Sequence, residues 1–314
     1  MSFSLSDLAV TTVSLSGPIA LAVLCVDWSE LSGVFVFGTE AVMLFGALSG
    51  FLGAYITGNL FLGIAIGVGS GVLTGLLTAF YEVTLNADQI IFAIAMLVVG
   101  PSLTDFIFGS YASTPAKALS TQVGTFSAIP IPYLSQIPIL GAFFDQTWIV
   151  YLTYGLLIFS EYFLYRTKWG LKIRAVGMNP RAADSMGANV YRIRYLAIII
   201  GAMMAALGGA AMILTGTGFW TDNITSGRGL IGVALVRVGN WKVGVTYAAA
   251  LLVSLLLAAA SDLTQIYSSS AGTTFPYEIF SALPYIFAVA VIGISYRWTR
   301  SNQPASIGLP YKRE

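Results

Sequence analysis

The chain has 314 residues, of which 57% are hydrophobic and only 9% are charged, and its formal net charge is +1. Since soluble domains usually carry about 25% charged residues, this composition indicates an integral membrane protein. The sequence contains no histidine and one cysteine, which excludes disulfides within the chain, metal sites built on those residues, and hydrolases that need a catalytic histidine.

Eight apolar runs are long enough to span a bilayer core of about 30 Å. In chain order they cover residues 9–26, 34–56, 60–81, 89–108, 148–165, 195–214, 243–261 and 279–296. The first run has no basic residue before it, so we expect it to remain as a helix rather than to be removed as a signal peptide. A ninth run, 229–240, is too short to cross alone and follows a stretch rich in Gly, Thr and Asn. Residues 215–240 are therefore predicted to form one broken crossing, an irregular segment followed by a half-helix.

A basic block at residues 166–194 orients these runs. It holds seven of the fifteen lysines and arginines and a single acid, Asp184. Loops with such an excess of positive charge stay in the cytoplasm. Counting crossings in both directions from the block predicts nine crossings, with the N-terminus outside and the basic tail, 297–314, inside. Because no basic residue precedes Lys117, the charge count does not test the orientation of the first helix. Residues 109–147 then form an external loop, which either covers the helices or docks an external partner.

Two six-residue segments, 58–63 and 239–244, share the pattern Gly-Asn-x-x-x-Gly. Each lies between two apolar runs, and the charge count places the first outside and the second inside. The two halves are therefore predicted to be inverted repeats, as in many transporters whose site lies at the membrane midplane. The expected fold is an all-α integral membrane protein with about nine crossings, forming a single transmembrane domain over residues 1–314.

Glycine recurs at every fourth position of the run 60–81, at Gly63, Gly67, Gly71 and Gly75. Small residues at this spacing share one helix face and let membrane helices approach closely. We interpret this stripe as a packing surface rather than as a binding site.

Four acidic or amide side chains are candidates for a pathway through the bundle. Glu40 lies inside an apolar run, where a charge costs roughly 2.5–3.5 kcal/mol and therefore needs a partner. It is expected either to line a pathway or to hold a neighbouring helix. Asn86, Asp88 and Gln89 stand at the start of the run 89–108, where an acid also caps a helix favourably. Capping and pathway lining both remain open for these three residues.

The broken crossing carries another group of candidates: Phe219, Trp220, Asn223 and Arg228. Aromatic rings together with amides suit a planar polar solute such as a nucleobase or a sugar. Tryptophan also collects at membrane interfaces for general reasons, so Trp220 has an alternative role as an interface residue.

The basic block has an internal order beyond its charge. Asn179 can cap a helix, Pro180 fits the first helical position, and Gly187 fits the end. The order predicts a short helix that offers a contact surface to a soluble partner. A merely solvated loop would explain the charge but not this order.

These residues resemble a known family. Residues 174–183 followed by Gly187 look like the signature RAVGxNPxAAxxxG of permease subunits of ABC importers for branched-chain amino acids, simple sugars and nucleosides. Residues 227–234 are similar to the family's GRGFIAIA segment, and residues 40–47, 87–89, 137–141 and 283–285 are most similar to the nucleoside branch. The chain departs from the family at 35–39 and at Ala41, both near the expected pathway. In the family the signature forms a coupling helix that docks into the ATPase. The resemblance therefore implies that the residues that couple this chain to its ATPase are Arg174, Gly177, Asn179, Pro180, Arg181, Ala183 and Gly187.

The resemblance implies a cell-membrane permease subunit rather than an enzyme. Because the sequence has no GxxxxGK[ST] loop, ATP and Mg²⁺ are expected on a separate ATPase chain, with no cofactor bound here. The other expected partners are a second permease, either a copy or a paralogue, and an external substrate-binding lipoprotein; no nucleic acid is expected. A nucleoside is the leading solute, with a simple sugar or a branched-chain amino acid as the alternative. A different class, an ion-coupled secondary transporter, would use Glu40 together with Asp105 and Glu161.

Overall fold

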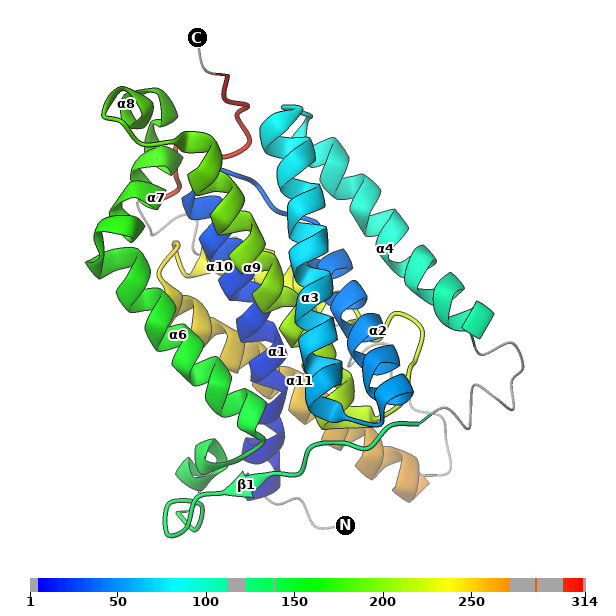
Figure 1. The fold of residues 1–314 in the computed structure, drawn as a ribbon. Coiled ribbons are helices and arrows are strands. Elements are labelled where there is room, and N and C mark those ends of the chain that lie inside the picture. The colour runs from blue at the N-terminus through cyan, green and yellow to red at the C-terminus, as the bar shows by residue number, and fades with distance from the viewer. Residues whose placement is uncertain (1–4, 112–121, 138, 272–285, 287–301, 313–314) are drawn as a thin grey trace.

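A computed structural model describes residues 5–111, 122–137, 139–271, 286 and 302–312. Within this part of the chain, seven helices are long and apolar enough to cross a membrane. They are α1 (Leu5–Leu31), α2 (Thr39–Thr57), α3 (Leu60–Ala79), α4 (Gln89–Tyr111), α6 (Trp148–Arg166), α9 (Val190–Met212) and α11 (Val243–Ala271) (Figure 1). The all-α membrane fold expected from composition is confirmed.

Shorter elements connect and extend these helices. Two π-helical turns, η1 (Phe80–Thr84) and η3 (Ile213–Thr217), continue α3 and α9. The helices α7 (Lys168–Met178), α8 (Pro180–Ser185) and α10 (Arg228–Val238) are too short to span a bilayer. A 3₁₀ turn, η2 (Leu140–Phe144), precedes the second strand of a small antiparallel pair, β1 (Ile129–Pro130) and β2 (Asp145–Gln146).

The loops lie at two opposite ends of the bundle (Figure 1). One end, called the α8 end, holds the basic block and the C-terminal tail, of which the structure describes residues 302–312. The other end, called the β1 end, holds the N-terminus of α1 and the two strands. This is the alternation that the charge count requires. The predicted crossing 279–296 lies outside the described residues, so nine remains a predicted number.

The broken crossing has the predicted form. The chain leaves η3 at Gly218, whose φ of +70° is left-handed, and stays irregular to Gly227 before α10 begins. With 11 residues, α10 is roughly 16 Å long, about half of a bilayer core. The irregular segment is partly buried: Trp220, Ile224 and Thr225 are buried, whereas residues 221–223 are exposed.

The predicted run 34–56 is wrong at its start, because α2 begins only at Thr39. Residues 34–37 are not helical, although Val34 is fully buried. The side chain of Gln89 explains how this is tolerated, because its Oε1 accepts the backbone N–H of Phe35 at 2.7 Å. Both α2 and α10 therefore begin inside the bundle after an irregular segment.

The packing of the helices is consistent with inverted repeats. α1 and α9 pack on each other; α9 also packs against α2 and α3, whereas α1 packs against α10 and α11. The turn at 58–63 lies at the β1 end (Figure 1), whereas Asn240 contacts the tail at the α8 end through a 2.7 Å hydrogen bond from the backbone N–H of Asn302. The two matching turns therefore face opposite ends.

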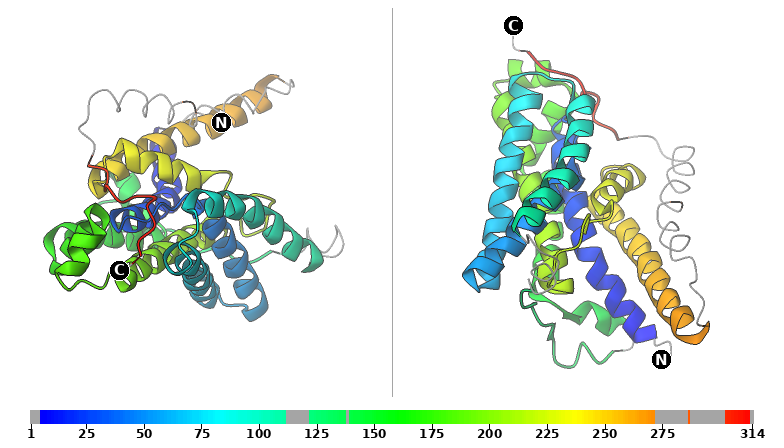
Figure 2. Two further views of the ribbon diagram at one scale, coloured as in Figure 1. Left: turned by 90° about the horizontal axis from the view of Figure 1, so that it is seen from above. Right: turned by 90° about the vertical axis from the view of Figure 1, so that its right-hand side faces the viewer.

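The glycine stripe of α3 packs as predicted. A Cβ placed on Gly71 would lie 2.7 Å from the carbonyl oxygen of Ala202, and one placed on Gly67 would lie 2.9 Å from the Cβ of Ala210. The stripe therefore holds α3 against α9, and also against α2. Around this tight centre, α4 and α6 lie on opposite flanks of the bundle (Figure 2).

Candidate functional site

The basic block folds as the local sequence rules predict. The Asn179 side chain accepts the backbone N–H of Ala182 at 3.1 Å, and Pro180 takes the first position of α8. Gly187 ends this short helix, with its N–H bonded to the carbonyl of Asp184 at 2.8 Å and a φ of +84°. The block is therefore two ordered helices, α7 and α8, rather than an irregular solvated loop.

The residues of the signature divide between two faces. Gly177 and Ala183 are buried, and a Cβ on Gly177 would clash with the carbonyl oxygen of Leu31 at the end of α1. Arg181 is exposed, and Met186 is exposed over 88% of its surface. The buried face holds the segment on the bundle, and the exposed face is available at the α8 end.

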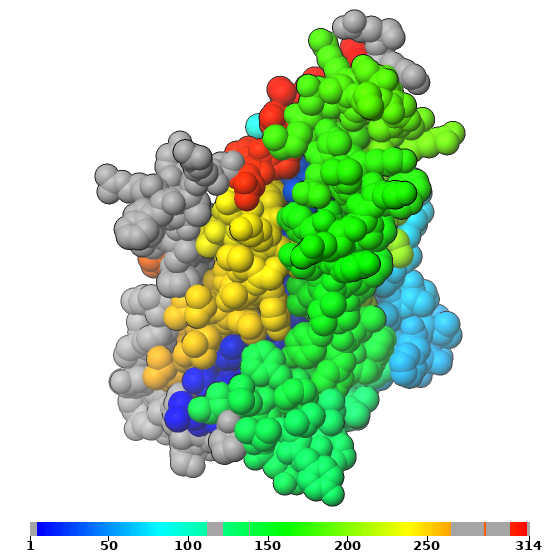
Figure 3. Space-filling model, turned by 90° about the vertical axis from the view of Figure 1, so that its left-hand side faces the viewer, coloured from blue at the N-terminus to red at the C-terminus, as the bar shows by residue number. Residues whose placement is uncertain are grey.

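Arg194 is not part of the exposed basic surface, although the sequence places it in the basic block. It is 1% exposed, and its guanidinium donates to the carbonyl oxygens of Ser32 (3.3 Å) and Leu309 (3.5 Å) and to Oγ of Ser306 (3.4 Å). The backbone N–H of Ser306 donates to the carbonyl of Gly177 at 3.0 Å. The tail is thereby fixed between α7–α8 and the α10–α11 region, where Figure 3 shows it in red between green and yellow.

Glu40 holds the start of α10. Its Oε1 accepts the hydroxyl of Thr225 and the N–H of Gly227 (2.7 Å), and its Oε2 accepts the N–H of Gly229 (2.7 Å). The carboxylate lies in the first turn of α2 and at the N-terminus of α10, where the dipoles of both helices favour a negative charge. These bonds are those of a side chain that holds a neighbouring helix, which is one of the two roles open from the sequence; the pathway role stays a prediction.

The contact with Glu40 requires glycine at positions 227 and 229. Gly227 has a φ of +77°, a left-handed conformation that favours glycine. A Cβ on Gly229 would lie 2.6 Å from the Cα of Glu40, so only glycine lets the two helix starts approach this closely.

Arg228 lines a cavity of about 270 Å³ between α1, η3 and the broken crossing, and its guanidinium lies 3.7 Å from the sulfur of Met212. Besides its aliphatic walls, the cavity is lined by the hydroxyl-bearing residues Ser14, Thr215, Thr217 and Thr221. A guanidinium among hydroxyl groups offers hydrogen bonds to a small polar solute.

Of the other candidates of the broken crossing, Trp220 and Asn223 face α4, and Phe219 meets the long loop. The rings of Trp220 and Phe108 are 5.7 Å apart, and Trp220 and Asn223 lie beside Asp105. Phe219 pairs with Gln122 in an isolated bridge, next to a 2.8 Å bond from the N–H of Val123 to the carbonyl of Gly218. The part of the long loop that the structure describes is therefore bonded to the broken crossing at the β1 end.

Asn86, Asp88 and Gln89 lie apart from this group, at the α8 end. Asp88 caps α4, because its Oδ1 accepts the N–H groups of Ile90 (2.9 Å) and Ile91 (3.0 Å). Asn86 has a φ of +52° in the turn before it. The two bonds to Asp88 confirm its capping role. Asn86 forms the turn before α4, and Gln89 binds the backbone of Phe35.

A junction that the sequence reading missed lies at the other end of α10. Glu30 of α1 is fully buried; it forms an ion pair with Arg237 (3.1 Å) and accepts Nε1–H of Trp241 (2.8 Å). The hydroxyl of Tyr165 donates to the carbonyl oxygen of Trp241, and the guanidinium of Arg174 lies 5.0 Å from the centre of the Tyr165 ring. The signal was available in part, since Glu30 and Arg237 both fall at the inner ends of predicted crossings.

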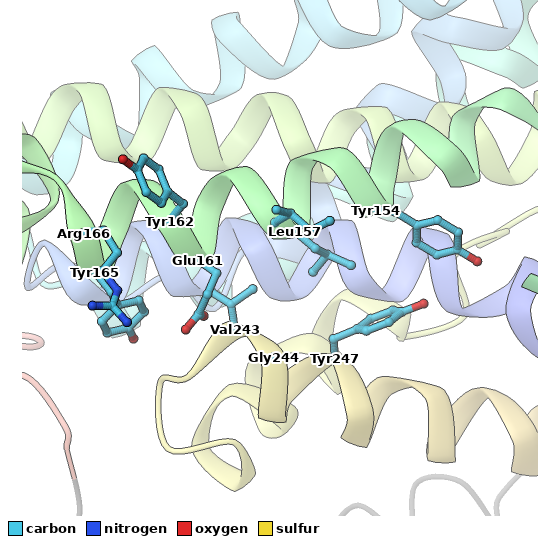
Figure 4. A pocket seen from close by; sticks show the side chains of 10 residues that line it. Tyr154, Leu157, Glu161, Tyr162, Tyr165, Arg166, Val243, Gly244 and Tyr247 are labelled. Carbon is cyan, nitrogen blue, oxygen red and sulfur yellow. The ribbon is translucent and has the colours of Figure 1, made fainter.

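A larger cavity of about 550 Å³ lies between α6 and α11. Figure 4 shows Glu161 and Tyr165 on the α6 side and Val243 and Tyr247 on the α11 side. Glu161 is thus on the flank opposite α4, which carries Asp105 (Figure 2). Among the described residues, no group of three His, Cys, Asp or Glu side chains is placed to hold a metal ion.

The sequence matches the family model described as the permease component of the branched-chain amino acid transport system over residues 8–298. It is 33% identical to the putative glucose ABC transporter permease protein TsgC13 of Haloferax volcanii over 335 aligned residues, covering 100% of this chain and 99% of the relative. It is 30% identical to the guanosine ABC transporter permease protein NupQ of Bacillus subtilis, covering 98% and 97%. It is 28% identical to the nucleoside ABC transporter permease protein NupC of Lactococcus lactis, covering 85% of each chain.

These matches extend over nearly the whole chain and agree with a bundle of membrane-spanning helices. The chain therefore belongs to the permease-component family of branched-chain amino acid transport systems and is a multi-pass membrane permease subunit of an ABC importer.

Proposed function

We propose that this subunit carries a nucleoside or a similar small polar solute inward across the cell membrane, driven by ATP that a separate ATPase chain binds with Mg²⁺ and hydrolyses. The observation that carries the proposal is the capped helix α8, held on the bundle by Gly177 and exposing Arg181 and Met186 at one end. A rigid surface of this kind suits docking by a soluble partner. No covalent chemistry takes place in this chain.

In this proposal the α8 end is cytoplasmic and the β1 end is external. The residues of the signature that would engage the ATPase directly are Arg181 and its neighbours on the exposed face, while Arg174, Gly177, Asn179, Pro180, Ala183 and Gly187 shape the segment. A second permease subunit, a copy or a paralogue, would complete the pathway.

The external partner would dock on the β1 end. The segment 129–140 exposes a set of large apolar side chains there, among them Tyr133, which is 86% exposed. These are Ile129, Ile131, Tyr133, Leu134, Ile137, Ile139 and Leu140. Because residues 122–126 are bonded to the broken crossing, a substrate-binding lipoprotein pressing on this surface would act directly on the pathway.

The solute would pass the broken crossing, where Phe219, Trp220, Asn223 and Arg228 offer rings, an amide and a guanidinium. Glu40 would keep the start of α10 in place beside it, and Asn86, Asp88 and Gln89 would border the inner mouth. Rings that stack on a base and donors that bind its edge or its ribose suit a nucleoside.

A simple sugar is the second candidate, favoured by the glucose permease relative with 33% identity; a branched-chain amino acid, as in the description of the family, is the third. An ion-coupled secondary transporter has little support. Both oxygens of Glu40 are occupied by donors, and Asp105 and Glu161 lie on opposite flanks.

The test is uptake into proteoliposomes that contain the permease and its co-purified ATPase. Labelled guanosine, glucose and leucine are supplied in parallel, each with its binding protein, and with either ATP or a proton or sodium gradient. The proposal expects ATP-dependent uptake of guanosine that unlabelled glucose does not reduce. Glucose uptake in its place supports the second candidate, and uptake driven by an ion gradient without ATP contradicts the proposal.

A further inference from the structure

The short helix α10 is held at both ends by buried carboxylates from other helices. Glu40 of α2 accepts two backbone N–H groups at its N-terminal end, and Glu30 of α1 binds Arg237 and Trp241 at its C-terminal end. Between these two points α10 has only 11 residues. It therefore has two defined attachments, one deep in the bundle and one near the α8 end.

The attachment near the α8 end is joined to the signature segment by direct contacts. Arg174 of α7 lies over the ring of Tyr165 in the last turn of α6, and the Tyr165 hydroxyl donates to the backbone carbonyl of Trp241. We call the set Arg174, Tyr165, Trp241, Glu30 and Arg237 the Glu30 junction. In it, α7, α6, the turn after α10 and α1 meet within one continuous set of contacts.

We propose that the Glu30 junction transmits the movement of α7 and α8 to α10, and that α10 then shifts the irregular segment 218–227 beside Glu40. The inference rests on the proposed function, because it needs an ATPase that moves α8. Glu30, Tyr165 and Trp241 are positioning residues in this scheme, since they act on the pathway only through α10.

Breaking either attachment of α10 is energetically unfavourable, so a movement at one attachment is expected to displace α10 rather than to separate it from its partner. A contiguous set of contacts carries a displacement only where its parts move together. Separating Arg237, whose side chain is partly exposed, from the fully buried carboxylate of Glu30 would leave that carboxylate without its cation, which is unfavourable. Separating Glu40 from α10 would leave buried N–H groups without acceptors. Both losses are avoided only where the parts of α1 and α2 that carry the two carboxylates move together with α10.

The test uses the assembled complex with its ATPase and compares solute imported with ATP hydrolysed. Tyr165→Phe removes the hydroxyl that binds the carbonyl oxygen of Trp241, and Trp241→Phe removes the donor to Glu30. Each is expected to lower the import-to-hydrolysis ratio by about fivefold, the factor that one hydrogen bond represents. Because both changes break one chain of contacts, the double variant should be no worse than the more severe single variant. Tyr162→Phe, an exposed tyrosine on the same helix, is the matched control and should leave the ratio unchanged.

A second readout does not need the identity of the solute. The single native cysteine, Cys25, is buried, so a cysteine introduced as Thr221→Cys on the exposed part of the broken crossing reports that segment alone. Its rate of reaction with a maleimide should change when ATP and vanadate are added to the complex. The proposal expects this change to be lost in Tyr165→Phe and Trp241→Phe and kept in Tyr162→Phe.

Two results would overturn the inference. One is an unchanged ratio together with an unchanged ATP effect on labelling in the junction variants. The other is a parallel fall of uptake and hydrolysis with less assembled complex, which would assign the junction a purely structural role. Failure of the proposed function looks different, because no ATPase would then co-purify with the unaltered chain.

Discussion

Removing the carboxylate of Glu40 is expected to destabilise the bundle more than removing any exposed acid. In Glu40→Ala, the hydroxyl of Thr225 and the N–H groups of Gly227 and Gly229 lose a buried acceptor. At about 1.5 kcal/mol for each bond to a charged group, the loss is roughly 4–5 kcal/mol. Glu40→Gln keeps one amide oxygen as an acceptor but turns its NH₂ group toward a donor, so an intermediate loss of about 2 kcal/mol is expected.

The assay is thermal unfolding of the purified protein in detergent. At about 2 °C for each kcal/mol, Glu40→Ala should lower the unfolding temperature by roughly 8–10 °C and Glu40→Gln by about half as much. Glu161→Ala, which removes an exposed acid from α6, serves as the control and should shift it little. An unfolding temperature in Glu40→Ala equal to that of the control would refute the reasoning. Loss of ion-dependent uptake in such a stable variant would instead make Glu40 an ion carrier.

Three further predictions concern the packing of α3, the cap of α8 and the attachment of the C-terminal tail. Gly71→Leu should abolish folded protein in a gel-filtration assay, because a side chain there meets Ala202; a normal elution profile and yield would contradict the packing of α3 on α9. Asn179→Ala should weaken α8 by about 1 kcal/mol and reduce the amount of co-purified ATPase, while Asn189→Ala, which removes the cap of α9, should spare α8. Arg194→Met should release the tail, measured as faster proteolysis after Asn302; equal proteolysis in Arg192→Met and Arg194→Met would show that the buried guanidinium does not fix it.

Local rules predicted the signature segment correctly. The cap at Asn179, the proline at the first position and the left-handed glycine at the end each depend on a few neighbouring residues. The broken crossing was also predictable, because an apolar run of half the required length has few ways to sit in a membrane. The glycine stripe on α3 needed only its spacing to identify a contact face.

Contacts between distant parts of the chain explain what the sequence reading missed. The late start of α2 depends on Gln89, which lies 54 residues after Phe35 and supplies an acceptor to its N–H. Arg194 looks like the rest of the basic block, and only the position of the tail shows it to be buried. Glu30 and Arg237 are 207 positions apart, so the position of each at the inner end of a predicted crossing did not reveal that they form a pair.

The central claim is that an ATPase drives this subunit through α8. The most direct measurement is cross-linking in native membranes from Met186→Cys, at a side chain that is exposed over 88% of its surface. Ser110→Cys, at the exposed far end of α4, is the control. The account predicts an ATPase subunit joined to the cysteine at 186, with a yield that changes when ATP and vanadate are added, and none joined at 110. A cysteine at 186 that reacts readily with maleimide yet joins no ATPase would contradict the account.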